Sequence, residues 1–232
     1  MPTKTIEYEL VELDSLHRKF YEAIKDGVKE EADKIELNVK NILALTTRLR
    51  QATSSPAMLT TSPPDSSKIN RIVELAEDIL EAGEKVVIMS VFKEPVYQIA
   101  TKLEKFRPLV CTGDQSEESV FKNIQHFRND KDFNIVVGTH AKIGTGHSMP
   151  ECQYMLMLDT PWTEAQTSQS MDRIYRITSD KPIYVKILCG KDTIDERVRE
   201  LVENKKELAD YLVDGLPNPK FTDALRSILR DL

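Results

Sequence analysis

The sequence has little cysteine and no excess of positive charge. It has 3 cysteines in 232 residues, and 38 acidic against 32 basic side chains give a formal net charge of −6 at pH 7. A protein that simply coats DNA has a basic balance, so any contact with DNA must be local. Cys111, Cys152 and Cys189 lie far apart, beside apolar runs and without C-x-x-C spacing. This pattern predicts reduced, buried thiols and a cytoplasmic setting.

Long apolar runs are also absent. The opening MPTKTIEYEL has no apolar core of a signal peptide. With 40% hydrophobic and 30% charged residues, the composition is that of a soluble globular protein and predicts no membrane partner. The length suits one large α/β domain, alone or with a smaller helical piece. His140 and His147 are seven apart with no third nitrogen or sulfur nearby, so no metal site is predicted.

No G-x-x-x-x-G-K-[ST] loop occurs in the sequence, and no strand is followed by an Asp-Glu-x-His-like acidic box. Such segments bind a triphosphate and magnesium and hold the attacking water in nucleotide-driven proteins. Their absence argues against a nucleotide-binding protein that acts alone.

From residue 68 onward, helical and strand patterns alternate. Apolar strand-like runs separated by amphipathic segments occupy residues 85–92, 109–111, 133–139, 154–159 and 182–188. Continuous apolar runs are typical of strands buried on both faces. The alternation predicts an α/β fold with a parallel sheet flanked by helices.

The first third of the chain has a different pattern. Residues 5–13 alternate as a strand with Ile6, Tyr8 and Leu10 on one face. A helix capped by Asp14 or Ser15 should follow and end at Gly27, striped by Leu16, Phe20 and Ile24. Further predicted segments are a helix to about Ala52, a packed connector at 53–67, and helices at 193–213 and from 221 onward. The resulting division is 1–62, a strand with a helical extension; 63–213, the α/β domain; and 214–232, a helical tail.

The segment QSMDRIYRIT, residues 169–178, places Gln169, Arg173 and Arg176 at helical spacing. Residues three and four apart share a helix face, so these side chains should project together. Two guanidiniums held in this way suit the charge that spreads over a transferring phosphoryl group. A solvated arginine face beside acidic partners is the alternative for a bare R-x-x-R.

The order of motifs resembles the second motor lobe of superfamily II helicases, and among them the Swi/Snf family of DNA translocases. That family carries a Q-A-x-D-R-x-x-R-I-G-Q box, with Ser170 here in the alanine position and Thr178-Ser179 in place of Gly-Gln. A D-x-x-W-N-P turn precedes the family's box, and Asp159 and Trp162 match it. The family's helix start after the box is matched by Thr193-Ile194-Asp195-Glu196. The resemblance covers roughly residues 63–200.

The loop HAKIGTGHSMP, residues 140–150, resembles the family's fifth motif, which begins with Ser or Thr and contains G-x-G. Gly144 and Gly146 would let the backbone approach a phosphate or sugar. The resemblance implies nucleotide contacts at Gly144, Gly146 and Asp172, and DNA backbone contacts at Ser90, Thr139 and Lys142. Ser90 could equally satisfy its strand end, Lys142 could be a solvated lysine, and Trp162 and Asp159 could serve packing and hydrogen bonding to the following turn.

The resemblance implies a RecA-like fold and the carboxy-terminal half of a larger DNA-dependent ATPase. Arg173 and Arg176 would act as arginine fingers, and Gln169 would position an arginine or touch the nucleotide. ATP and Mg²⁺ would be held mainly by a separate first lobe, and the partner would be double-stranded DNA. The chain alone is expected to be monomeric and inactive. The alternative is a non-catalytic nucleic-acid or protein-binding α/β module.

Overall fold

The computed structural model describes residues 3–35, 38–144, 146, 148–175, 181–204 and 219–231. By compactness, the chain forms two units. The first contains residues 1–11, 68–161 and 165–189. The second contains residues 12–67, 162–164 and 190–232. This grouping differs from the predicted division at residues 62 and 213, because the first strand joins the sheet unit and the early helices join the late ones. The predicted division stays a prediction.

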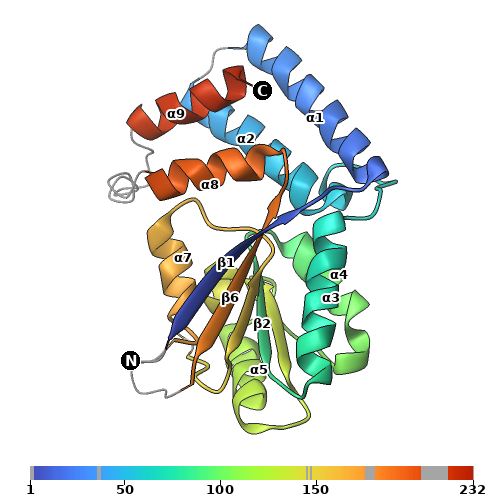
Figure 1. Ribbon diagram of the computed structural model, residues 1–232, viewed down its shortest axis with the longest axis vertical. Coiled ribbons are helices and arrows are strands. Elements are labelled where there is room, and N and C mark those ends of the chain that lie inside the picture. The colour runs from blue at the N-terminus through green and yellow to red at the C-terminus, as the bar shows by residue number, and fades with distance from the viewer. Residues whose placement is uncertain are drawn as a thin grey trace. The chain divides into compact units, whose positions relative to one another are not determined.

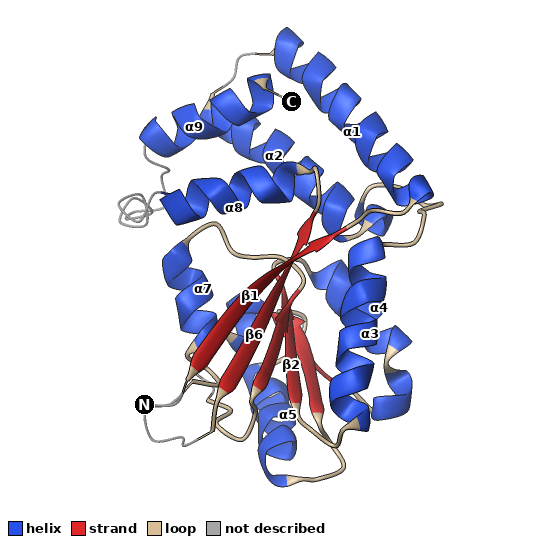
Figure 2. Cartoon of the chain, viewed as in Figure 1, coloured by secondary structure: helices blue, strands red, loops and turns tan. Residues whose placement is uncertain are grey.

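The first unit is built on a six-stranded parallel sheet of order β1-β6-β5-β2-β4-β3 (Figure 2). Its strands are β1 (Lys4–Val11), β2 (Val86–Ser90), β3 (Leu109–Cys111), β4 (Ile135–Thr139), β5 (Tyr154–Met157) and β6 (Ile183–Gly190). The predicted parallel sheet is therefore confirmed. The central strands β2 and β4 are buried at every residue, as their unbroken apolar runs require.

Helices cover both faces of this sheet (Figure 1). They are α3 (Ser67–Glu81), α4 (Lys93–Lys102), α5 (Glu117–Asn129), the short α6 (His140–Ile143) and α7 (Glu164–Met171), with a 3-10 turn η2 (Glu104–Phe106) after α4. Alternate strand residues point to opposite faces. Val86 and Ile88 thus join α3 and α4 in one core. Val87 and Met89 join α5, α6 and α7 in the other.

The second unit is helical and has its own core. It contains α1 (Ser15–Lys34), α2 (Val39–Ser54), a 3-10 turn η1 (Pro56–Met58), α8 (Ile194–Asn204) and α9 (Pro219–Arg230). The predicted connector at 53–67 is packed, with Leu59 against this core. Trp162 also packs here, its ring 4.4 Å from the guanidinium carbon of the buried Arg50. The packing role is the one observed for Trp162.

The predicted helix end at Gly27 is wrong. α1 continues to Lys34, and the face it buries contains His17, Tyr21 and Val28, while Leu16 is 67% exposed. Glycine inside a helix costs about 1 kcal/mol relative to alanine. Burial of side chains such as Tyr21 and Val28 outweighs this cost.

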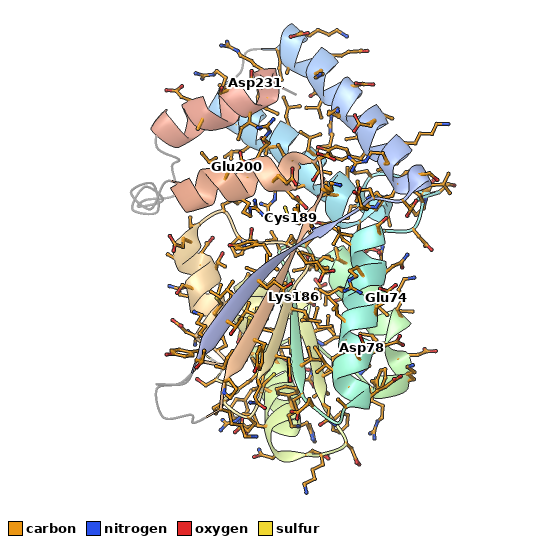
Figure 3. All side chains as sticks on the ribbon, viewed as in Figure 1. Glu74, Asp78, Lys186, Cys189, Glu200 and Asp231 are labelled. Atoms are coloured by element: carbon orange, nitrogen blue, oxygen red, sulfur yellow. The ribbon has the colours of Figure 1, made fainter. Side chains whose placement is uncertain are left out.

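β1 is an edge strand whose apolar face is partly exposed. Ile6, Tyr8 and Leu10 share that face, as predicted, at 43%, 37% and 46% exposure. The opposite face carries Glu9, whose carboxylate accepts from Lys186 on β6 at 2.9 Å and from Arg71 on α3. Figure 3 labels Lys186 on β6, the strand next to β1. β1 is thus held by an ion-paired polar face and by Val11, which enters the core.

All three cysteines are free and buried. Burial raises the pKa of the Cys111 and Cys152 thiols to about 12, so both stay protonated at neutral pH. The prediction of buried thiols is confirmed. Among the described helices, none has both the length and the apolar character to cross a membrane.

Candidate functional site

The carboxyl ends of four neighbouring strands meet at one edge of the sheet. Ser90, the last residue of β2, is the register partner of Thr139, the last residue of β4. Cys111 at the end of β3 pairs with Gly138, and Met157 at the end of β5 pairs with Met89. In open parallel sheets ligands bind outside this edge. The structure therefore brings the predicted residues Ser90 and Thr139 side by side.

Ser90 and Thr139 are buried, at 1% and 5% exposure. The Ser90 hydroxyl donates to the Asp159 carboxylate at 3.0 Å and accepts from the Phe92 amide at 3.1 Å. The same carboxylate accepts from the Val91 amide. Asp159 thus binds the turn after β2. The sequence predicted a different contact for it, a hydrogen bond to the turn that follows Asp159 itself. The DNA contacts assigned to Ser90 and Thr139 stay predictions, and the strand-end role of Ser90 is what the structure contains.

His140 connects this edge to α7. Its ring is buried, Nε2 lies 3.0 Å from the Asp159 carbonyl oxygen, and Nδ1 lies 2.9 Å from the Ser170 hydroxyl. Since a carbonyl oxygen only accepts, Nε2 carries a hydrogen. Ser170 Oγ also lies 3.0 Å from the Gln166 carbonyl oxygen. The ends of β4 and β5 and the helix before the arginines are therefore joined by one polar network.

The helix carrying the predicted arginine box is shorter than expected. α7 ends at Met171, and Asp172, Arg173 and Ile174 form a turn instead of a further helical segment. Arg173 folds back, its Nε donating to the Gln169 carbonyl oxygen at 3.0 Å. Its own carbonyl accepts from the Met149 amide at 2.7 Å. The Arg173 and Ile174 amides donate to the carbonyls of Ser170 at 3.2 Å and Met171 at 3.1 Å, the 3-10-type bonds that often close the last turn of a helix.

The side chains of this turn differ in accessibility. Gln169 and Asp172 are exposed and Arg173 is partly exposed, so all three can reach a ligand. Arg173 contacts the backbone carbonyl of Gln169, and the joint projection of the two side chains stays a prediction. Arg176, together with Ile177 and Thr178-Ser179, lies outside the described residues.

The glycine-containing loop begins with one helical turn, α6, instead of irregular loop. Gly144 closes that turn, and a Cβ there would lie 3.1 Å from the Ser170 hydroxyl and 2.3 Å from the His140 carbonyl oxygen. Gly146 has φ of +81°, a conformation that side chains rarely adopt. Gly146 is exposed and Gly144 is buried, so only Gly146 presents open backbone. Thr145 and His147 lie outside the described residues.

Lys142 is paired with an acidic residue of α5. Its side chain is 16% exposed and its amine contacts the carboxylate of Glu117, itself 81% exposed. A second pair lies at the same edge, where Lys93 at the start of α4 contacts Asp114 at 2.7 Å. Lys142 is therefore a lysine in an ion pair and differs from the solvated lysine of the alternative, while its DNA contact stays a prediction.

Among the residues that the structure describes, no cluster of three or more His, Cys, Asp or Glu side chains could hold a metal ion. The sequence does not predict the polar network that joins Ser90, Asp159, His140 and Ser170. It offers His140 only as a possible metal ligand and Ser170 only as a departure from alanine. The available signal was that His140, Asp159 and Ser90 each end an apolar strand run, so the parallel topology had to bring them to one edge.

Comparison with known proteins agrees with this geometry. Residues 67–178 match the family of helicase conserved C-terminal domains. This match supports a carboxy-terminal motor lobe of a superfamily II helicase over that stretch. The matched stretch begins with α3 and ends at residue 178, beyond the last described residue of this segment, Tyr175. It therefore contains every predicted site residue of this lobe.

The lobe is similar to longer helicases. An uncharacterised ATP-dependent helicase of Mycoplasma genitalium is 29% identical over 212 residues, covering 90% of this chain and 21% of that protein. The chain spans about a fifth of the length of the first curated relatives it matches.

Solved structures share the fold. The C-terminal domain of the SWI2/SNF2 ATPase of Sulfolobus solfataricus aligns with a TM-score of 0.74 at 20% identity, over 99% of this chain and 97% of that one. The core of the same ATPase, solved in complex with double-stranded DNA, aligns with a TM-score of 0.75 at 21% identity, over 99% and 48%. The fold expected of a Swi/Snf-type second lobe is thus confirmed.

Proposed function

We propose that this lobe is the arginine-bearing half of a DNA-dependent ATPase of the translocase type. The observation that carries the proposal is the network from Ser90 through Asp159 and His140 to Ser170. It ties the strand ends proposed to face DNA to the helix and turn that hold Gln169 and Arg173. Because hydrogen bonds join the strand ends to α7 and its turn, a displacement of one should shift the other. A motor requires such coupling between its DNA contact and its nucleotide site.

Arg173 is proposed to meet the phosphates of ATP held by a separate first lobe. Its guanidinium is partly exposed, and its Nε bond to the Gln169 carbonyl holds it at the end of α7. An arginine suits a phosphate geometrically because its donors form a rigid fork. Arg176 is proposed for the same role and Gln169 for orienting one of the two, with Asp172, Gly144 and Gly146 near the nucleotide.

ATP would supply the phosphoryl group, and Mg²⁺ would neutralise its charge. Arg173 fits the phosphates, and the described residues offer no acidic cluster for the metal. Mg²⁺ is therefore proposed to bind to the first lobe. Relatives named ATP-dependent helicases support ATP use by the whole protein, and the DNA-bound neighbour supports a duplex partner.

The DNA-facing surface is proposed to be the carboxyl edge around Lys142, Ser90 and Thr139. The test is ATP turnover with and without duplex DNA, using this chain alone and joined to an amino-terminal motor lobe. DNA-stimulated turnover only after joining supports the proposal. Silence with a competent first lobe would instead favour a non-catalytic binding module.

A further inference from the structure

Two lysines at the carboxyl edge are each held by an acidic residue from one short segment. Lys93 follows β2 and contacts Asp114, while Lys142 follows β4 and contacts Glu117. Both carboxylates lie between β3 and the first turn of α5. β3 and β2 flank β4 on its two sides, so the segment and both lysines share one edge of the sheet.

Asp114 is held in place by a tight turn. Its Oδ1 accepts from Lys93 at 2.7 Å and its Oδ2 from the Tyr97 hydroxyl at 3.0 Å. The Tyr97 hydroxyl also lies 2.8 Å from the Thr112 hydroxyl, and the Gln115 side chain accepts from the Thr112 amide at 3.1 Å. The hydrogen bond to Lys93 lowers the pKa of Asp114, and that to Asp114 raises the pKa of Lys93. Both groups are charged at neutral pH.

The Lys93–Asp114 pair lies at the surface, with side chains 55% and 50% exposed. In the second pair Glu117 is 81% exposed, and Lys142, 16% exposed, contacts it from a mostly buried position. Exposed ion pairs contribute little to stability, so another anion can exchange with these carboxylates at small cost. A phosphate backbone offers such anions at regular spacing along a duplex.

We propose that Lys93 and Lys142 form a phosphate-binding surface that Asp114 and Glu117 keep neutral until a nucleic-acid backbone displaces the two carboxylates. The inference rests on the proposed DNA contact of this edge and adds the acidic residues that limit it. The four side chains together carry no net charge before binding. Because the two lysines are already paired, the lobe should bind non-specific nucleic acid weakly.

Neutralising the carboxylates should strengthen binding and make it more sensitive to salt. Asp114→Asn and Glu117→Gln remove the competing charge and keep hydrogen-bonding groups of similar size. We expect each to tighten binding of a labelled DNA duplex by about threefold, and the pair by about tenfold. Two unmasked lysines should steepen the slope of log affinity against log salt by about 2. Fluorescence anisotropy of the 232-residue chain at several salt concentrations measures both quantities.

Two sets of variants separate this effect from net charge and from misfolding. Glu118→Gln removes the same charge one residue away on α5, where Glu118 pairs with Lys122 instead of a lysine of the edge. It should leave affinity nearly unchanged. In the Asp114→Asn, Glu117→Gln background, Lys93→Ala with Lys142→Ala should remove the gain. Circular dichroism confirms that each variant is folded.

The outcomes distinguish the two proposals. Suppose that the wild-type chain binds duplex DNA and that the double variant binds no tighter and has the same salt slope. This result overturns the masking role and leaves the DNA contact standing. An equal gain from Glu118→Gln also overturns it. No duplex binding by any folded variant at low salt overturns the DNA contact together with its mask.

Discussion

At the scale of single residues, Arg173 is the side chain on which the proposed chemistry depends most. It is partly exposed, beside the exposed Gln169, and its backbone is held by the Met149 amide. Its position is therefore fixed while its guanidinium remains accessible. An arginine finger raises the rate of phosphoryl transfer by a factor of about 10³–10⁵.

We predict that Arg173→Ala, in a protein joined to its first motor lobe, lowers DNA-stimulated ATP turnover by about 10³-fold or more with little change in ATP affinity. Arg176→Ala should act in the same way. Arg128→Ala is the matched control, since Arg128 on α5 pairs with Glu151 at 3.2 Å. Normal turnover in both finger variants would refute the assignment.

His140 is the residue through which strand ends and α7 are connected. His140→Ala leaves the buried Asp159 carbonyl and Ser170 hydroxyl without this partner, and we predict a loss of about 1–3 kcal/mol in the free energy of unfolding. His126→Ala, at an exposed position on α5, should cost about 0.5 kcal/mol or less. Urea unfolding measures both values.

Ser170→Ala, which restores the residue usual in the Swi/Snf box, completes a double-mutant cycle with His140→Ala. We expect a coupling energy of about 1 kcal/mol, within the range for groups in one hydrogen-bonded network. Strict additivity of the two changes would show that the hydrogen bond between His140 and Ser170 contributes nothing to the fold.

At the scale of elements, two glycines should respond to alanine in opposite ways. Gly27 lies inside α1, where a Cβ meets nothing within 4 Å. We predict that Gly27→Ala raises the free energy of unfolding by about 0.5–1 kcal/mol, because glycine loses more backbone entropy than alanine. A destabilised variant in thermal or urea unfolding would contradict this expectation.

Gly138 keeps β3 and β4 in close pairing. A Cβ there would lie 2.3 Å from the Cys111 carbonyl oxygen and 2.4 Å from Ile143 Cδ1. Gly138→Ala should therefore cost about 2–3 kcal/mol of stability through overpacking. Gly113→Ala is the control at the same edge, because a Cβ at Gly113 meets open space. Equal stability of the two variants would contradict the close approach.

The strands and most helices could be predicted because their patterns are local. The apolar runs at 85–92 and 133–139 became the buried strands β2 and β4, and Ser116 caps α5 where acidic residues open the helix. Helix ends were less predictable. α1 continues past Gly27 because side chains beyond it are buried. α7 ends at Met171, and the Arg173 carbonyl just after it accepts a hydrogen bond from the Met149 amide.

The candidate site was predictable in outline and not in its contacts. The family resemblance implied roles for Ser90, Thr139 and the arginine box. It did not indicate that Ser90 would be buried against Asp159, or that Lys142 would pair with Glu117. Those contacts join residues 69 and 25 positions apart, and only the strand order brings them together.

At the scale of the whole molecule, the chain is short beside its relatives and has no phosphate-binding loop of its own. It spans about a fifth of the first relatives' length. We predict that the chain alone hydrolyses no ATP above background, with or without duplex DNA. A phosphate-release assay checks this, and measurable turnover by the isolated chain would contradict it.

The most direct measurement is ATP turnover, with and without duplex DNA, by this chain joined to an amino-terminal motor lobe. If the chain is the arginine-bearing second lobe, duplex DNA should stimulate turnover and Arg173→Ala should abolish it. Absence of turnover with a first lobe that is competent beside another second lobe would contradict the motor role. The chain would then be a binding module that shares the lobe's fold.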